Sequence, residues 1–220
     1  MGTNIPASTA GGGLSTADAA YIHGWFNDQQ AFMTSKLSFL TEFRGIPLGI
    51  MPDGSGGNAT DPFATGQSYE GGAVGSPGSA SLPLSTLVWQ TPNTSGFGMT
   101  VRGKFAAVNG SVQQVGPTNV PTSQYVTIAL TTVLDATKLV LRIVGAGTTL
   151  LSMTVADTLV HDYAIFFDKT IVTVYQDKTL IGSQATITNL PTGALGPQIF
   201  SVAGAGGFVA HNAIWGYVAP

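Results

Sequence analysis

The order of apolar and polar positions divides the chain into a helical region followed by many short strands. Between Thr16 and Arg44, apolar side chains recur every three or four residues, which is the spacing of one face of an α-helix. Ser15 is placed to cap the start of this helix, and Gly45 follows where a C-terminal cap is expected. The pattern therefore predicts one long amphipathic helix from Thr16 to Arg44.

Later runs of the chain are rich in β-branched and aromatic residues and read as short strands. Val126, Ile128 and Leu130 alternate with smaller or polar positions, as expected of a strand that is buried on one face. The expected strands are Phe97–Val108, Gln124–Thr131, Lys138–Val144, Thr148–Val155, Leu159–Phe167, Thr170–Gln176 and Phe208–Val218. This spacing predicts a mainly β fold, an antiparallel jelly-roll sandwich preceded by an extended arm and one long N-terminal helix.

Turn-forming residues suggest how the chain is divided. Residues 1–45 are expected to form an N-terminal arm and the amphipathic helix, which serve attachment or oligomerisation. Residues 46–82 are rich in Gly, Pro, Ser and Asn without a sustained period, so they are expected to form a linker. Residues 83–220 then form the β jelly-roll domain.

Charge is unusually sparse, because only 9% of the residues are Asp, Glu, Lys or Arg, compared with about 25% in ordinary soluble domains. A surface of Ser, Thr, Asn and Gln can be desolvated against a neighbour without burying ions, so extensive subunit contacts are expected. The net charge of −3 with eight basic residues gives no electrostatic footprint for nucleic acid. No run of about 18 apolar residues is present, so no membrane partner is expected.

The wide apolar stripe of the predicted helix suggests self-association. Such a stripe would be exposed in a monomer, and exposed patches beyond a few hundred Å² are rare. A homotrimer or a higher symmetric assembly is therefore expected, although the local β domain is an alternative cover. The residues assigned to oligomerisation are Ile22, Trp25, Phe26, Phe32, Met33, Leu37, Leu40 and Phe43.

The segment from Val160 to Ser183, VHDYAIFFDKTIVTVYQDKTLIGS, carries a family resemblance. It resembles the central hairpin of concanavalin-A-like and laminin-G-like jelly-roll domains, in which a Val-x-Val-Tyr strand end is followed by an Asp-led turn. The matching positions here are His161, Tyr163, Ile165, Val172, Val174, Tyr175, Asp177 and Leu180. Lys178 departs from the pattern, since glycine is usual in that turn. The resemblance implies a fold rather than an activity.

The arm, helix and linker, joined to a nearly neutral β domain, are similar in style to bacteriophage virion proteins. This second resemblance implies a virion structural protein, a capsid decoration, head-fibre or tail component, located in the virion beside other virion proteins. The alternative is a carbohydrate-binding or host-receptor-binding module that contacts surface glycans. An enzyme is not expected, and neither is a cofactor. Glu42 and Glu70 are the only glutamates, and they fall in the predicted helix and linker rather than as a catalytic pair on a strand.

Two groups of side chains are weighed as binding sites. Trp215 and Tyr217 share one face of a strand and are candidates for a glycan-stacking platform, with burial in the sandwich core as the alternative. Asp157, Asp162, Asp168 and Asp177 surround the hairpin that carries the resemblance and are candidate calcium ligands. Their alternative role is in turns and at strand ends, where Asp is common.

Overall fold

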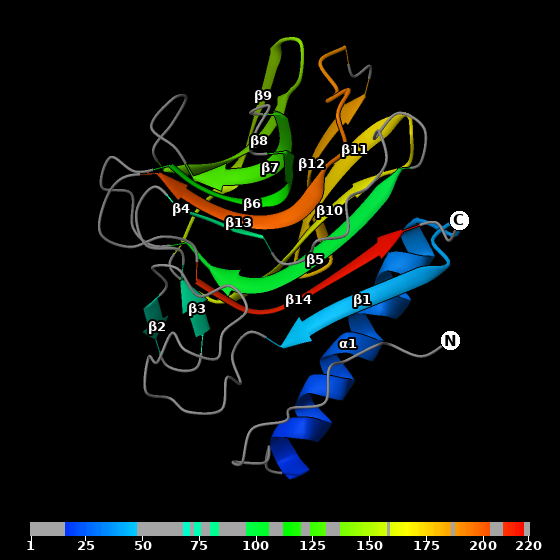
Figure 1. The fold of residues 1–220 in the computed structure, drawn as a ribbon, viewed down its shortest axis with the longest axis vertical. Coiled ribbons are helices and arrows are strands. Elements are labelled where there is room, and N and C mark those ends of the chain that lie inside the picture. The colour runs from blue at the N-terminus through cyan, green and yellow to red at the C-terminus, as the bar shows by residue number, and fades with distance from the viewer. Residues whose placement is uncertain are drawn as a thin grey trace.

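The fold is a two-layer β-sandwich with one helix on its outside (Figure 1). The computed structural model describes residues 16–47, 68–70, 73–75, 80–83, 96–105, 112–119, 124–130, 137–157, 159–185, 188–202 and 209–217. Both sheets are antiparallel throughout, which confirms the predicted fold class of a mainly β sandwich with an N-terminal helix. Within the described part, no helix is both long and apolar enough to cross a membrane.

The larger sheet has eight strands in the order β12-β11-β10-β5-β14-β3-β2, with β1 also paired to β14. Strand β10 lies between β5 and β11, so the hairpin that carries the family resemblance occupies one half of this sheet. The strand bounds are β1 Glu42–Pro47, β2 Ser68–Glu70, β3 Ala73–Gly75, β5 Phe97–Lys104, β10 His161–Phe167, β11 Ile171–Gln176, β12 Thr179–Ala185 and β14 Val209–Tyr217.

The smaller sheet has six strands in the order β4-β13-β6-β7-β8-β9. Its centre is β7, which pairs with β6 on one side and β8 on the other. The strand bounds are β4 Ala80–Pro83, β6 Val112–Asn119, β7 Gln124–Leu130, β8 Lys138–Val144, β9 Thr148–Val155 and β13 Gly196–Val202. Strands β2 and β3, and all of β4 except Pro83, therefore fall within the segment that was predicted to be a linker.

The core between the sheets is built from alternate residues of the facing strands. Met99, Ile128, Leu141 and Ile165 are each at most 2% exposed and belong to this core. Alternation follows from the two-residue period of a strand, which sends successive side chains to opposite faces. Both sheets bow in the same direction, so the outer face of the six-stranded sheet is the hollow side and the helix lies on the other side (Figure 1).

The helix is shorter than the sequence pattern predicted. Helix α1 runs from Thr16 to Lys36, and the chain then turns through a Leu40 N–H that donates to the Leu37 carbonyl at 3.1 Å. The prediction that it continues to Arg44 is wrong, because β1 pairs with β14 instead and satisfies its backbone hydrogen bonds there. Gly45 lies in this strand, and a Cβ at that position would overlap the ring of Phe26. The glycine thus permits close packing of the helix rather than capping it.

Candidate functional site

The residues assigned to oligomerisation form a second apolar cluster within one chain. Trp25, Phe26, Met33, Leu37, Leu40 and Phe43 are between 0% and 7% exposed and pack against Ala164, Phe166 and Ile214 on the outer face of the eight-stranded sheet. Phe32 is partly buried against the same cluster, and the side chain of Ile22 lies outside the described residues. The apolar stripe that suggested a trimer is therefore covered by the chain's own sheet. The oligomeric state itself stays a prediction.

A polar contact anchors the helix beside this cluster. Asp162, on β10, accepts hydrogen bonds from Trp25 Nε1 at 2.8 Å and from Gln29 Nε2 at 3.4 Å. The same carboxylate forms an ion pair with Arg102 of β5 at 3.2 Å. Burial raises the pKa of Asp162, although the hydrogen bond from Trp25 and the charge of Arg102 oppose this shift. Asp162 therefore links α1 to the eight-stranded sheet.

A second ionic group lies at the end of the same strands. His161 contacts Asp177 through Nδ1 at 2.5 Å and Asp157 through Nε2 at 3.0 Å. Burial alone would lower the pKa of His161, but the hydrogen bonds to Asp177 and Asp157 outweigh it and raise the pKa. The His161 ring thus ties the segment before β10 to the turn after β11.

The four candidate calcium ligands do not come together. Asp157 and Asp177 bind His161, Asp162 binds the helix and Arg102, and Asp168 accepts hydrogen bonds within the turn after β10. In the part of the chain that the structure describes, no three His, Cys, Asp or Glu side chains are grouped so that they could hold a metal ion. The aspartates thus take turn and strand-end roles.

Trp215 does not line a surface. Its side chain is 2% exposed and packs in the core between the sheets, beside Ala213 from the same strand. The side chain of Tyr217 lies outside the described residues. A ligand therefore has no access to the indole ring of Trp215 in this fold.

A polar network on the hollow face of the six-stranded sheet was not anticipated from the sequence. Arg142, on β8, donates from Nη1 to Gln114 Oε1 at 3.2 Å and from Nη2 to the Tyr125 hydroxyl at 2.8 Å. The Thr127 hydroxyl also donates to Gln114 Oε1, at 3.1 Å. The signal that could have revealed it is a single arginine inside the otherwise apolar strand Leu139–Val144.

Burial divides this network into a fixed part and an accessible part. Thr127 is fully buried and Gln114 is 3% exposed, whereas Tyr125 and Arg142 are partly exposed. The guanidinium carbon of Arg142 lies 4.9 Å from the centroid of the Tyr125 ring, within the range of a cation–π contact. Gln114 and Thr127 therefore hold Arg142 in place, and Arg142 and Tyr125 are the two members of the network that are partly exposed.

The charge of Arg142 is not neutralised by the described residues. Its hydrogen-bond partners there are an amide oxygen and a phenol oxygen, and Nε is buried without a hydrogen-bond partner in this part of the structure. Buried polar groups are nearly always paired in proteins, so an orphaned donor needs an explanation. Arg142 as a residue is partly exposed, so N–H groups other than the buried Nε–H are those available to oxygen acceptors of a ligand.

The sequence matches no protein-family model and no curated protein. Similar solved structures exist. The free and NAG-bound forms of the Crh5 transglycosylase are each 14% identical, with TM-scores of 0.58 and 0.57, and the match covers 83% of this chain and 86% of theirs. A Bacillus licheniformis β-glucanase is 17% identical over 82% of this chain and 99% of its own, with a TM-score of 0.47. The Caenorhabditis elegans galectin LEC-6 is 10% identical over 64% and 92%, with a TM-score of 0.43.

These comparisons correct the predicted function. The architecture is the antiparallel two-sheet β-sandwich that the hairpin between Val160 and Ser183 suggested, and the Crh5 transglycosylase shares this fold, which confirms that part of the resemblance. The prediction of a virion structural protein is wrong, since the similar structures with TM-scores above 0.5 are those of a transglycosylase. The prediction that the chain is not an enzyme is overturned by the same finding. Sparse charge, on which the virion reading rested, describes a surface and does not specify a partner.

Proposed function

We propose that this chain is a glycan-binding domain whose ligand contacts Arg142 and Tyr125 on the hollow face of the six-stranded sheet. The observation that carries the proposal is a partly exposed arginine that, among the described residues, is held by two neutral oxygens and by no carboxylate. Concave surfaces with a few well-placed polar groups are the usual form of small-molecule sites. The proposal also agrees with the architecture, which this chain shares with a transglycosylase that was solved with NAG.

The chemistry of a sugar fits this pair of side chains. A guanidinium offers five N–H donors in one plane; Gln114 and Tyr125 accept one each from Nη1 and Nη2, and because Nε is buried the second N–H of each Nη is the one left for a ligand. Neighbouring hydroxyls of a pyranose present oxygen acceptors at a spacing that such a planar fork can meet. The Tyr125 hydroxyl accepts a hydrogen bond from Arg142, so its own proton is available to a ligand oxygen.

The proposal concerns ligand binding at this network, which offers hydrogen-bond donors and no carboxyl group of its own. Glycoside hydrolysis commonly requires two carboxyl groups roughly 5–9.5 Å apart. Strands β4, β6, β7, β8, β9 and β13 contain neither Asp nor Glu, so the face around Arg142 supplies no such pair from its own strands. The functional test nevertheless includes an assay for hydrolysis, because the comparisons place enzymes on this architecture.

The test is a glycan array with the full chain, followed by calorimetry on the best ligand. Arg142→Ala should weaken binding by about tenfold or more, because a charge-assisted hydrogen-bond donor is lost. Arg142→Lys should recover little of this loss, since an ammonium does not reproduce the planar fork. Arg44→Ala, which removes an exposed arginine from β1 on the other sheet, is the matched control and should bind like wild type.

Three outcomes would count against the proposal. Binding that survives Arg142→Ala unchanged would move the glycan site elsewhere, and an array without any bound glycan would reject the function. Release of new reducing ends by the wild-type chain would replace binding with catalysis as the role of the domain.

A further inference from the structure

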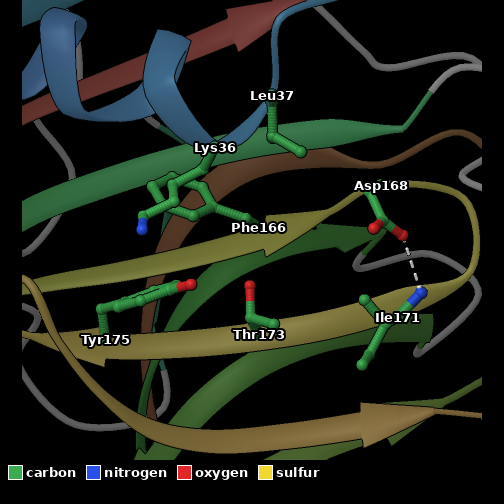
Figure 2. A pocket seen from close by; sticks show the side chains of 7 residues that line it. All are labelled: Lys36, Leu37, Phe166, Asp168, Ile171, Thr173 and Tyr175. Atoms are coloured by element: carbon green, nitrogen blue, oxygen red, sulfur yellow. Dashed lines mark hydrogen bonds between the residues drawn. The ribbon is translucent and has the colours of Figure 1, made fainter.

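A small pocket opens on the opposite side of the sandwich from Arg142, on the outer face of the eight-stranded sheet (Figure 2). It lies beside the C-terminal end of α1 and has a volume of about 120 Å³. Leu37, Phe166 and Ile171 supply its apolar lining, and Phe166 and Leu37 are only 1% and 2% exposed. An apolar cavity of about 150 Å³ accommodates benzene, so this pocket suits a ligand of comparable size rather than an oligosaccharide.

One end of the pocket is positively charged. Lys36 Nζ lies 5.3 Å from the centroid of the Tyr175 ring and 5.5 Å from that of Phe32, which are cation–π distances. Tyr175 is itself oriented by Phe32 at 5.3 Å and by Phe166 at 5.5 Å. Among the described residues no carboxylate pairs with Lys36, so its ammonium is held over the aromatic wall without a counterion.

The other end is negatively charged. Asp168 Oδ1 accepts hydrogen bonds from Thr170 N at 2.9 Å, Thr170 Oγ1 at 2.7 Å and Ile171 N at 2.9 Å. Burial would raise the pKa of Asp168, but the hydrogen bonds from Thr170 and Ile171 outweigh it and lower the pKa. The carboxylate is therefore ionised at neutral pH. Figure 2 shows the second carboxylate oxygen of Asp168 on the pocket side of the turn, at the opposite end of the pocket from Lys36.

We propose that this pocket binds a small zwitterion whose carboxylate faces Lys36 and whose ammonium faces Asp168. The carbon chain between the two charges would lie over Phe166 and Ile171, and the hydroxyls of Thr173 and Tyr175 line the same space. Charges of opposite sign at the two ends, separated by apolar surface, select against ligands that carry only one charge. This inference goes beyond glycan binding and uses a different face of the molecule.

The probe is 6-aminohexanoate, titrated into the full chain by NMR, with hexanoate and hexylamine as ligands that each lack one charge. The zwitterion should bind about tenfold more tightly than either, because each end contributes a charge-assisted contact. A series from 4-aminobutanoate to 8-aminooctanoate should show one preferred length, which reports the span from Lys36 to Asp168. Equal affinity for 6-aminohexanoate and hexylamine, or no binding of any probe, would overturn the proposal.

Two variants assign the two ends. Asp168→Asn keeps an oxygen for the turn, and it should reduce the affinity for the zwitterion to that for hexanoate. Lys36→Met should reduce it to that for hexylamine. Lys169→Met and Asp28→Asn remove the same charges outside the pocket lining and should leave binding unchanged. A comparable loss in these controls would show that net charge, and not the pocket, determines affinity, and would also overturn the proposal.

Discussion

The outer faces of the two sheets each hold a partly exposed arginine, and the two are treated differently. Arg102, on the face covered by α1, pairs with the carboxylate of Asp162 at 3.2 Å. Within the described part of the chain, Arg142, on the hollow face of the other sheet, contacts the neutral groups of Gln114 and Tyr125 and no carboxylate. A partly buried charge that is paired with a counterion stabilises the fold, whereas one with neutral partners can still attract polar or charged groups of a ligand.

The outer faces of the two sheets also differ in which residues are buried on them. The helix buries Trp25, Phe26 and Met33 on one face, and the Asp162 carboxylate accepts from the buried Trp25 and Gln29. On the hollow face the buried members of the network are Gln114 and Thr127, which fix Arg142 from below. The Asp162 group therefore holds the fold together, whereas Gln114 and Thr127 position a partly exposed side chain.

The largest expected effect tests this difference directly. Asp162→Ala should lower the free energy of unfolding by about 3 kcal/mol, because the buried Trp25 and Gln29 donors lose their acceptor and Arg102 loses its counterion. Arg142→Ala should cost about 1 kcal/mol, since Gln114 retains the hydrogen bond from Thr127. Urea unfolding measures both. An equal or larger loss for Arg142→Ala would mean that Arg142 is as structural as Arg102.

The next largest effect concerns the packing of α1 against β1. Gly45→Ala should cost about 2 kcal/mol, because the new methyl group overlaps the fully buried ring of Phe26 and the helix must shift. Gly24→Ala is the matched control, since a Cβ there meets nothing within 4 Å and alanine is favoured over glycine in a helix by about 1 kcal/mol. If Gly45→Ala unfolds in the same urea concentration as wild type, the helix does not dock on β1 in solution, and an intermolecular role for its apolar stripe returns.

How far the sequence predicts this structure depends on how local each feature is. The predicted bounds Lys138–Val144 and Thr148–Val155 match β8 and β9, because alternation within a strand is a property of neighbouring residues. Strand β6 was missed, since Gly116 and Pro117 interrupt its pattern. The helix end was missed because Leu40 and Phe43 keep a helical spacing while tertiary pairing with β14 places Phe43 in a strand.

The candidate site depends on contacts between distant parts of the chain. Arg142 meets Tyr125 and Gln114 across separations of 17 and 28 residues, so the network exists only once three strands are in register. A lone arginine in an apolar strand was visible in the sequence, but its partners were not. The pocket similarly needs Lys36 of the helix to reach β10 and β11.

A smaller effect on the free energy of unfolding is expected from pH. It concerns His161 in the eight-stranded sheet, whereas Gln114 and Thr127 in the other sheet do not titrate. The pKa of His161 is raised above its ordinary value of 6.5, so its ion pairs stabilise the fold fully below about pH 6.5 and are lost as the pH rises through the folded-state pKa. For Asp157, burial raises the pKa, but the hydrogen bonds from Leu159 and His161 outweigh it and lower the pKa below 3.8. The stability contributed by Asp157 is therefore present above about pH 3.8 and is lost as the pH falls through the folded-state pKa. The contribution is roughly 0.5–1 kcal/mol because the carboxylates are exposed.

Unfolding at a series of pH values tests this window. His161→Gln should flatten the wild-type profile between about pH 4 and 8, as the titrating cation is removed. Arg142→Ala should shift the whole profile without changing its shape, because Gln114 and Thr127 do not titrate. A His161→Gln profile that keeps the wild-type slope would show that the ion pairs to Asp157 and Asp177 do not control stability.

The smallest effect concerns the turn that joins β11 to β12 next to the helix. Asp177 and Lys178 have φ values of 49° and 65°, a conformation that glycine adopts at little cost and a lysine does not. Lys178 also pairs with Asp28 at 2.6 Å, but both side chains are exposed and the pair contributes little. Lys178→Gly should therefore be more stable than wild type by about 0.5 kcal/mol, and more stable than Lys178→Ala by about 1 kcal/mol. Urea unfolding of both variants together with Asp28→Asn separates backbone strain from the ion pair. The opposite result would be equal stabilities of Lys178→Ala and Lys178→Gly, together with an equally large loss of unfolding free energy in Asp28→Asn. It would show that the ion pair with the helix, and not backbone strain in the turn, determines the stability at this edge of the sheet.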